Sequence, residues 1–92
     1  MGDSPKATTA KVTIENLAFG PKTLKVEKGT KVNWTNNDSD THTVTANAGS
    51  PVEFDAGNVA SGASVSVTFT KPGTYQYHCN IHTDMMATIV VS

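Results

Sequence analysis

Apolar and polar side chains alternate with a period of two along most of the chain after residue 10. Such alternation is typical of β-strands that bury one face and expose the other. No stretch shows the 3.6-residue apolar stripe of an amphipathic helix. The alternating segments are rich in β-branched and aromatic residues, and they span residues 11–15, 23–27, 31–35, 65–69, 75–77 and 87–91.

Turn residues separate these segments at regular intervals, at Gly20-Pro21, Lys28-Gly29, Ser61-Gly62 and Pro72-Gly73. Seven or eight short strands joined by such turns predict an all-β fold, either an antiparallel-rich sandwich or a barrel. The alternation also predicts which side chains face the interior. These are Val12, Ile14, Leu24, Val26, Val32, Trp34, Val67, Phe69, Tyr75, Tyr77, Ile89 and Val91.

Two segments interrupt the alternation. Residues 36–41 form a polar stretch that ends at His42, and we interpret it as a loop. Residues 46–63 are longer and irregular, with Pro51, Gly57 and Gly62. Phe54 lies within this second stretch, and we expect its ring to attach the stretch to the core.

The chain has 92 residues, which is enough for one small domain. We expect a disordered N-terminal arm over residues 1–10 and a single folded domain over 11–92. Hydrophobic residues make up 37% and charged residues 16%, as in a globular protein. The single cysteine excludes an internal disulfide, and a core of this size would benefit from another cross-link such as a bound metal.

Charge and hydropathy exclude several classes of partner. The formal net charge is -1, and all seven basic residues are lysines, which argues against nucleic-acid binding. No apolar run approaches the roughly 20 residues of a membrane-spanning helix. Residues 1–6 contain no apolar signal-peptide core, and we interpret the chain as a mature segment whose leader has been removed.

Candidate metal ligands cluster in the segment that follows residues 75–77. Cys79 is followed by His82 after three residues and by Met85 after three more. His42 begins a strand after the polar loop, and a sandwich can bring two such strand ends together at one pole. A thiolate, two imidazoles and a weak axial thioether form the ligand set of blue-copper electron-transfer sites. The predicted metal ligands are therefore His42, Cys79, His82 and Met85.

Other interpretations of these residues remain open at this stage. Cysteine with two histidines also suits a zinc site, although zinc rarely binds a thioether. A cysteine nucleophile with a histidine base is a third interpretation, and a metal-free immunoglobulin-like binding module is a fourth. His78 and Met86 alternate with Cys79 and Met85, so we expect both to face away from the site.

Segments 32–38, 42–44, 54–57 and 69–79, together with the C-x-x-H-x-x-M motif of Cys79–Met85, resemble the cupredoxins. The similarity extends over nearly the whole chain after residue 10 and is greatest to the plastocyanin and amicyanin branch. It implies a Greek-key β-sandwich and one type 1 copper ion that cycles between Cu(I) and Cu(II). It assigns His42, Cys79, His82 and Met85 as the ligands.

The resemblance also implies a function and a location. We expect a monomeric electron carrier of the periplasm or another extracytoplasmic compartment, with transient redox protein partners. The chain has Thr41, Thr83 and Ala87 where the family often has Pro, Pro and Gly. These departures allow an alternative function, in which copper with an open axial position reacts with a small molecule such as a nitrogen oxide.

Overall fold

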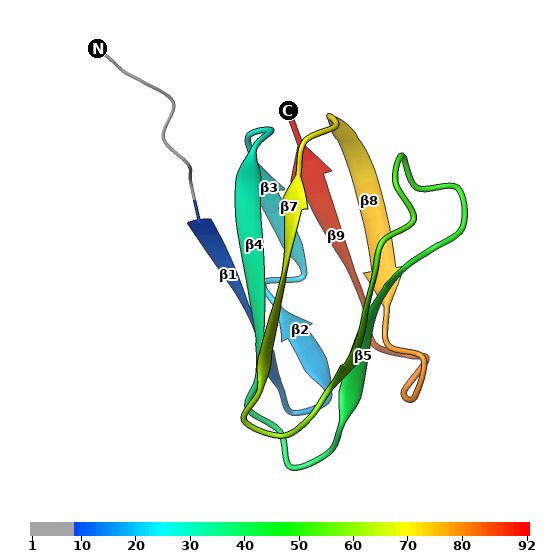
Figure 1. The fold of residues 1–92 in the computed structure, drawn as a ribbon. Coiled ribbons are helices and arrows are strands. Elements are labelled where there is room, and N and C mark those ends of the chain that lie inside the picture. Colours follow the sequence, from blue (N-terminus) through cyan, green and yellow to red (C-terminus); the bar gives the residue numbers. More distant parts are fainter. Residues whose placement is uncertain (1–8) are drawn as a thin grey trace.

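The computed structural model describes residues 9–92, which form two β-sheets packed face to face. Figure 1 shows both sheets with their strands running along the long axis of the molecule. Nine strands make up the sheets: β1 Thr9–Glu15, β2 Ala18–Gly20, β3 Thr23–Val26, β4 Thr30–Asn36, β5 His42–Ala46, β6 Asp55–Val59, β7 Ser64–Phe69, β8 Gly73–His78 and β9 Met86–Val91. Within the described residues, no helix has the length and apolar character needed to cross a membrane.

The strand order is β2-β1-β4-β7 in one sheet and β3-β9-β8-β5-β6 in the other. Most neighbours are antiparallel, but β1 pairs with β4 and β3 pairs with β9 in parallel. The chain therefore crosses repeatedly between the sheets, for example from β4 to β5 and from β7 to β8. The β4–β5 and β8–β9 loops lie at the lower pole in Figure 1, away from both described chain ends.

Side chains from the inner faces of both sheets fill the space between them. Trp34 lies at the centre, and its indole N–H donates a 3.1 Å hydrogen bond to the Tyr77 hydroxyl. Burial of the Tyr77 phenol raises its pKa well above the usual range. Phe54 packs among these rings, with its centroid 6.1 Å from that of Trp34 and 5.3 Å from that of Phe69. The core is thus largely aromatic near its centre.

The expected all-β sandwich is confirmed, as is the attachment of the long irregular stretch by Phe54. Of the twelve side chains expected inside, nine are buried, whereas Leu24, Val26 and Val67 are half-buried against the core. The strands number nine because the short β2 and the glycine-containing β6 also pair. β1 begins at Thr9, two residues before the expected domain boundary, and residues 1–8 of the expected arm lie outside the described residues.

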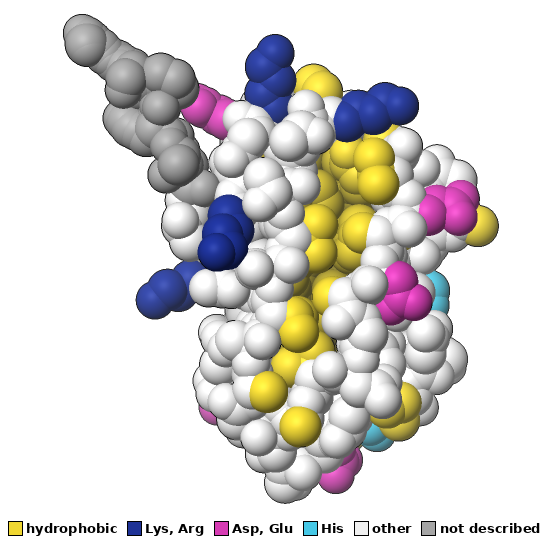
Figure 2. All heavy atoms as spheres, viewed as in Figure 1, with side chains coloured by type: hydrophobic (Ala, Val, Ile, Leu, Met, Phe, Trp, Pro, Cys, Tyr) yellow, Lys and Arg dark blue, Asp and Glu magenta, His cyan; other side chains and the backbone are white. Residues whose placement is uncertain are grey.

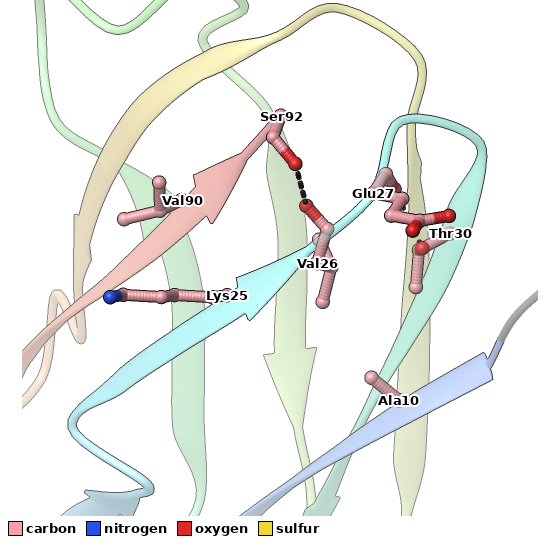
Figure 3. A pocket seen from close by; sticks show the side chains of 7 residues that line it. All are labelled: Ala10, Lys25, Val26, Glu27, Thr30, Val90 and Ser92. Atoms are coloured by element: carbon pink, nitrogen blue, oxygen red, sulfur yellow. Dashed lines mark hydrogen bonds between the residues drawn. The ribbon is translucent and has the colours of Figure 1, made fainter.

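An apolar groove opens between the sheets at the opposite pole. Its volume is about 460 Å³, and Figure 3 shows Ala10, Val26 and Val90 beside Lys25 and Glu27. The groove lies far from the loops that hold the candidate ligands, so it plays no part in the site described next.

Candidate metal centre

Three predicted ligands meet at the lower pole of the sandwich. His42 is the first residue of β5, Cys79 directly follows β8, and His82 lies in the β8–β9 loop. One ligand atom from each residue can be chosen so that all three lie within 4.8 Å of one another. The Nδ1 atoms of the two histidines are 3.2 Å apart, and the Nδ1 atom of His42 is 3.7 Å from the Sγ atom of Cys79. The sequence prediction that His42, Cys79 and His82 converge is confirmed.

The thiol of Cys79 is buried and is surrounded by hydrogen-bond donors. Burial alone would raise its pKa, but the backbone N–H groups of Thr43 and His82 donate to Sγ at 3.3 and 3.4 Å. A further hydrogen bond from the Ile81 backbone helps to lower the pKa to about 6. The site therefore favours the thiolate, which is the form that binds metals.

The two histidines differ in exposure. His42 is fully buried, and its Nε2 atom lies 2.9 Å from Oδ2 of Asp38. His82 keeps 31% of its side chain exposed, with the exposed Asp40 carboxylate 3.9 Å from its Nε2 atom. One histidine is thus held inside the protein, and the other reaches the surface.

Hydrogen bonds close the β8–β9 loop on itself and tie it to β5. The Cys79 N–H donates to the Met85 carbonyl at 3.1 Å, and the Met85 N–H donates to the His82 carbonyl at 2.9 Å. The Asn80 N–H donates to the Thr43 hydroxyl at 2.7 Å. These hydrogen bonds hold Cys79 and His82 at fixed distances from each other and from β5, and all of them are made by the polypeptide.

The neighbouring residues fall where their alternation predicts. Met85 is buried within the pole, whereas Met86 is 55% exposed. His78 lies outside the three-ligand cluster, with its ring nitrogens 2.5 Å from Asn47 Oδ1 and 2.8 Å from Asn80 Oδ1. The expectation that His78 and Met86 face away from Cys79 and Met85 is confirmed.

Three residues that contact the ligands or the ligand loop were not predicted from the sequence. Asp38 contacts His42, while Thr43 and Asn80 connect β5 to the ligand loop. Asp38 precedes His42 by four residues in a polar loop, and that spacing is a usable signal for a carboxylate partner of a ligand histidine. Thr43 and Asn80 carry no such signal, because their roles depend on how two distant loops pack.

The donor set suits a soft or borderline transition metal. Two imidazole Nδ1 atoms and a thiolate sulfur face a common point, and a thioether side chain is buried close by in sequence. Thiolate and imidazole together bind copper and zinc well, and the thioether favours copper. The residues present therefore fit a single copper ion.

Comparisons with known proteins agree with this geometry. The model of the cupredoxin-like domain matches residues 2–91. The amicyanin-alpha of Methylorubrum extorquens is 33% identical over 91 residues, which cover 97% of this chain and 76% of the relative. The amicyanin of Paracoccus denitrificans is 32% identical over 82 residues, or 87% of this chain and 63% of the relative.

Solved structures give the same result for the fold. The Cu(I) form of an amicyanin variant superposes with a TM-score of 0.84 at 29% identity, covering 98% of this chain and 87% of the other. A copper-containing nitrite reductase from Thermus scotoductus SA-01 also reaches a TM-score of 0.84, at 30% identity. This similarity covers 97% of the chain but only 23% of the reductase, so it concerns one part of that enzyme.

Proposed function

Because this chain belongs to the cupredoxin-like family, we propose that it is a type 1 copper protein that carries single electrons between redox partners. We assign His42, Cys79, His82 and Met85 as the ligands of one copper ion. The observation that carries this proposal is the convergence of two imidazole Nδ1 atoms and the Cys79 sulfur within 4.8 Å, at one pole of an amicyanin-like sandwich.

The chain's own residues provide what electron transfer requires. Copper, when bound, supplies a one-electron couple between Cu(I) and Cu(II). Cys79 contributes a thiolate, held by two backbone N–H donors, and His42 and His82 contribute neutral imidazole nitrogens. The strands and the hydrogen-bonded loop hold these ligands in place, so they move little when the charge at the site changes. A small reorganisation keeps the barrier to electron transfer low.

The route to a partner leads through His82. Cys79 and His42 are fully buried, and Met85 is 3% exposed, whereas the His82 ring reaches the surface. An electron donor or acceptor can therefore approach the site most closely at the exposed edge of this imidazole. Burial of Met85 favours this outer-sphere role over the alternative, in which a nitrogen oxide binds at an open axial position.

We also propose that the protein acts outside the cytoplasm, in the periplasm or another extracytoplasmic compartment, as a monomer with transient redox protein partners. The similarity to amicyanins over 97% of the chain supports this location and these partners. A transient partner needs only a small contact around His82, which agrees with a single exposed ligand edge.

The visible spectrum of the copper-loaded protein tests the proposed function. We expect an intense thiolate-to-Cu(II) charge-transfer band that disappears on one-electron reduction and returns on oxidation. Cys79→Ser should lose the band, because a hydroxyl cannot replace the thiolate, while its far-ultraviolet circular dichroism stays that of a β-sandwich. His78→Gln, at the neighbouring residue outside the cluster, should keep the band. A Cys79→Ser variant that keeps its intense colour, or a wild type that binds zinc and forms no coloured copper complex, would contradict the proposal.

A further inference from the structure

The carboxylate of Asp38 receives hydrogen bonds from two separate parts of the fold. The backbone N–H groups of Asn16 and Leu17 donate to Oδ1 at 2.7 Å and to Oδ2 at 2.9 Å. Oδ2 also lies 2.9 Å from Nε2 of the buried His42. Asp38 therefore connects the β1–β2 turn to a ligand histidine.

The turn that supplies the two amides has an uncommon backbone. Asn16 and Leu17 have φ angles of 56° and 58°, which place both in the left-handed region. A leucine rarely adopts this conformation, and its side chain here is 51% exposed, so side-chain burial does not offset the strain. This conformation directs the two adjacent N–H groups of Asn16 and Leu17 at the Asp38 carboxylate. Strained backbone of this kind concentrates at functional sites.

The rest of the loop fixes Asp38 from the other side. The Asp38 N–H donates to Oδ1 of Asn36 at 2.9 Å. Asn36 is itself buried, and its amide donates to the carbonyls of Asp40 and Val59, both at 2.8 Å. The carboxylate is thus held in place by its own loop, by the β1–β2 turn and by the end of β6.

This arrangement decides which nitrogen of His42 is free. Both oxygens of the Asp38 carboxylate already accept backbone N–H groups, Oδ1 from Asn16 and Oδ2 from Leu17, and such donors suit a carboxylate that carries no proton. An ionised carboxylate can only accept hydrogen bonds, so the proton must reside on Nε2 of His42. The Nδ1 lone pair is then directed toward the Cys79 sulfur and His82 Nδ1, at 3.7 and 3.2 Å.

We propose that Asp38 is a positioning residue of the copper site. It fixes the ring and the tautomer of His42, and the hydrogen bond makes Nδ1 a stronger donor that favours Cu(II) over Cu(I). By this preference Asp38 lowers the reduction potential. The claim about the tautomer concerns the polypeptide alone, whereas the claim about the potential rests on the proposed function.

Nitrogen-15 NMR of the copper-free protein tests the first claim. At a pH where the ring is neutral, wild-type His42 should carry its proton on Nε2, with Nδ1 unprotonated. Asp38→Asn should give a mixture of tautomers, because an amide can both donate and accept. Asp40→Asn removes a carboxylate from the same loop without contact to His42, and it should keep the wild-type tautomer. A wild type protonated on Nδ1 would overturn the proposal without any variant.

Copper affinity and reduction potential test the second claim. Asp38→Asn should weaken Cu(II) binding by about 10- to 100-fold, with a smaller loss for Cu(I). Each tenfold loss specific to Cu(II) raises the potential by about 59 mV. Asp40→Asn should shift the potential much less. Equal shifts in the two variants, or equal losses of Cu(I) and Cu(II) affinity in Asp38→Asn, would reduce Asp38 to a structural role.

Two controls keep these outcomes separable. If Asp38→Asn does not fold, Asp38→Glu replaces it in the test, because it keeps the negative charge. The reduction potential of Asp38→Glu should lie between two limits. One is the value of wild type and Asp40→Asn, and the other is the value expected when the contact with His42 is lost completely. A Glu variant that folds and shows a wild-type potential with a mixed tautomer would refute the link between the two claims. If wild type forms no charge-transfer band, the proposed function fails, but the NMR measurement still decides the tautomer.

Discussion

Two adjacent methionines illustrate how much depends on a single position. Met85 closes the ligand loop through its backbone and is 3% exposed, whereas Met86 begins β9 and is 55% exposed. The strict alternation of neighbouring side chains separates them, as it separates Cys79 from His78. Of the two, only Met85 has its side chain inside the metal-binding pole.

Replacement of each methionine by leucine tests this assignment. Met85→Leu should raise the reduction potential, because loss of a weak thioether donor destabilises Cu(II) more than Cu(I). Met86→Leu should leave the potential nearly unchanged, and it serves as the matched control. Cyclic voltammetry of both variants measures the difference. A larger shift from Met86→Leu would mean that the axial ligand has been misassigned.

The copper-free protein should show an unusually acidic thiol. The pKa of Cys79 falls from its usual 9.0 to about 6, so a thiolate absorbance near 240 nm should appear as the pH rises through 6. Because the folded pKa lies below the unfolded one, the folded state gains stability that is complete above pH 9. That stability is lost as the pH falls toward 6, at about 1.4 kcal/mol per pKa unit.

Denaturant unfolding of the copper-free protein between pH 6 and 9 measures this gain. Cys79→Ser provides the control, and its stability should change less over the same interval. A wild type whose free energy of unfolding is flat between pH 6 and 9 would show that the N–H donors do not stabilise the thiolate.

At the level of strands, the metal site lies where the backbone pairing of β5 with β8 ends early. The ladder between β8 and β9 has six residue pairs, but that between β5 and β8 has two, Thr45 with His78 and Ala46 with Tyr77. Nearer the pole, contacts that involve side chains join β5 to the ligand loop: Thr43 contacts Cys79 and Asn80, and Thr45 contacts Asn80. His42 also lies against the loop residues Cys79 and His82. Ligands on both sides of this gap would be cross-linked by a bound metal.

Copper removal should therefore loosen this end of the sheet. We expect hydrogen exchange at the amides of Thr43, Asn80 and His82 to be faster in the copper-free protein, while amides in the middle of β4 change little. Copper at 1,000 times its dissociation constant should add about 4 kcal/mol to the free energy of unfolding and raise the melting temperature. Equal exchange rates at Thr43 with and without bound copper would contradict a cross-linking role.

The sequence predicts strands well where the period of two is strong, and less well elsewhere. β6 was missed because Asp55 and Gly57 interrupt its alternation, and its pairing with β5 includes a register shift. The ligand motif was readable because Cys79, His82 and Met85 lie within one loop. The contacts of Asp38 with the β1–β2 turn could not be predicted from the sequence, since they join residues 21 and 22 positions apart through a left-handed turn without glycine.

Charge is distributed unevenly over the whole molecule. The loops of the metal-binding pole, residues 16–17, 37–41, 60–63 and 79–85, contain three aspartates and no lysine. Lys28 and Lys71 lie in turns at the opposite pole, and Figure 2 shows lysine side chains gathered toward that end. The surface nearest His82 is therefore negative although the net charge is only -1.

This asymmetry should control the rate at which small redox ions react with the protein. Electron transfer through the exposed edge of His82 should be faster with a cationic cobalt complex than with an anionic iron cyanide of equal driving force.

Raising the ionic strength should slow the cationic reaction, since salt screens exposed charges such as Asp40 over about 8 to 10 Å. Asp40→Asn should flatten this dependence, whereas Glu53→Gln, outside the loops of the pole, should not. Stopped-flow rates for both ions at several salt concentrations measure the effect. If the anionic ion reacts faster and is slowed by salt, electrons leave the protein near its lysines, and the route through His82 is wrong.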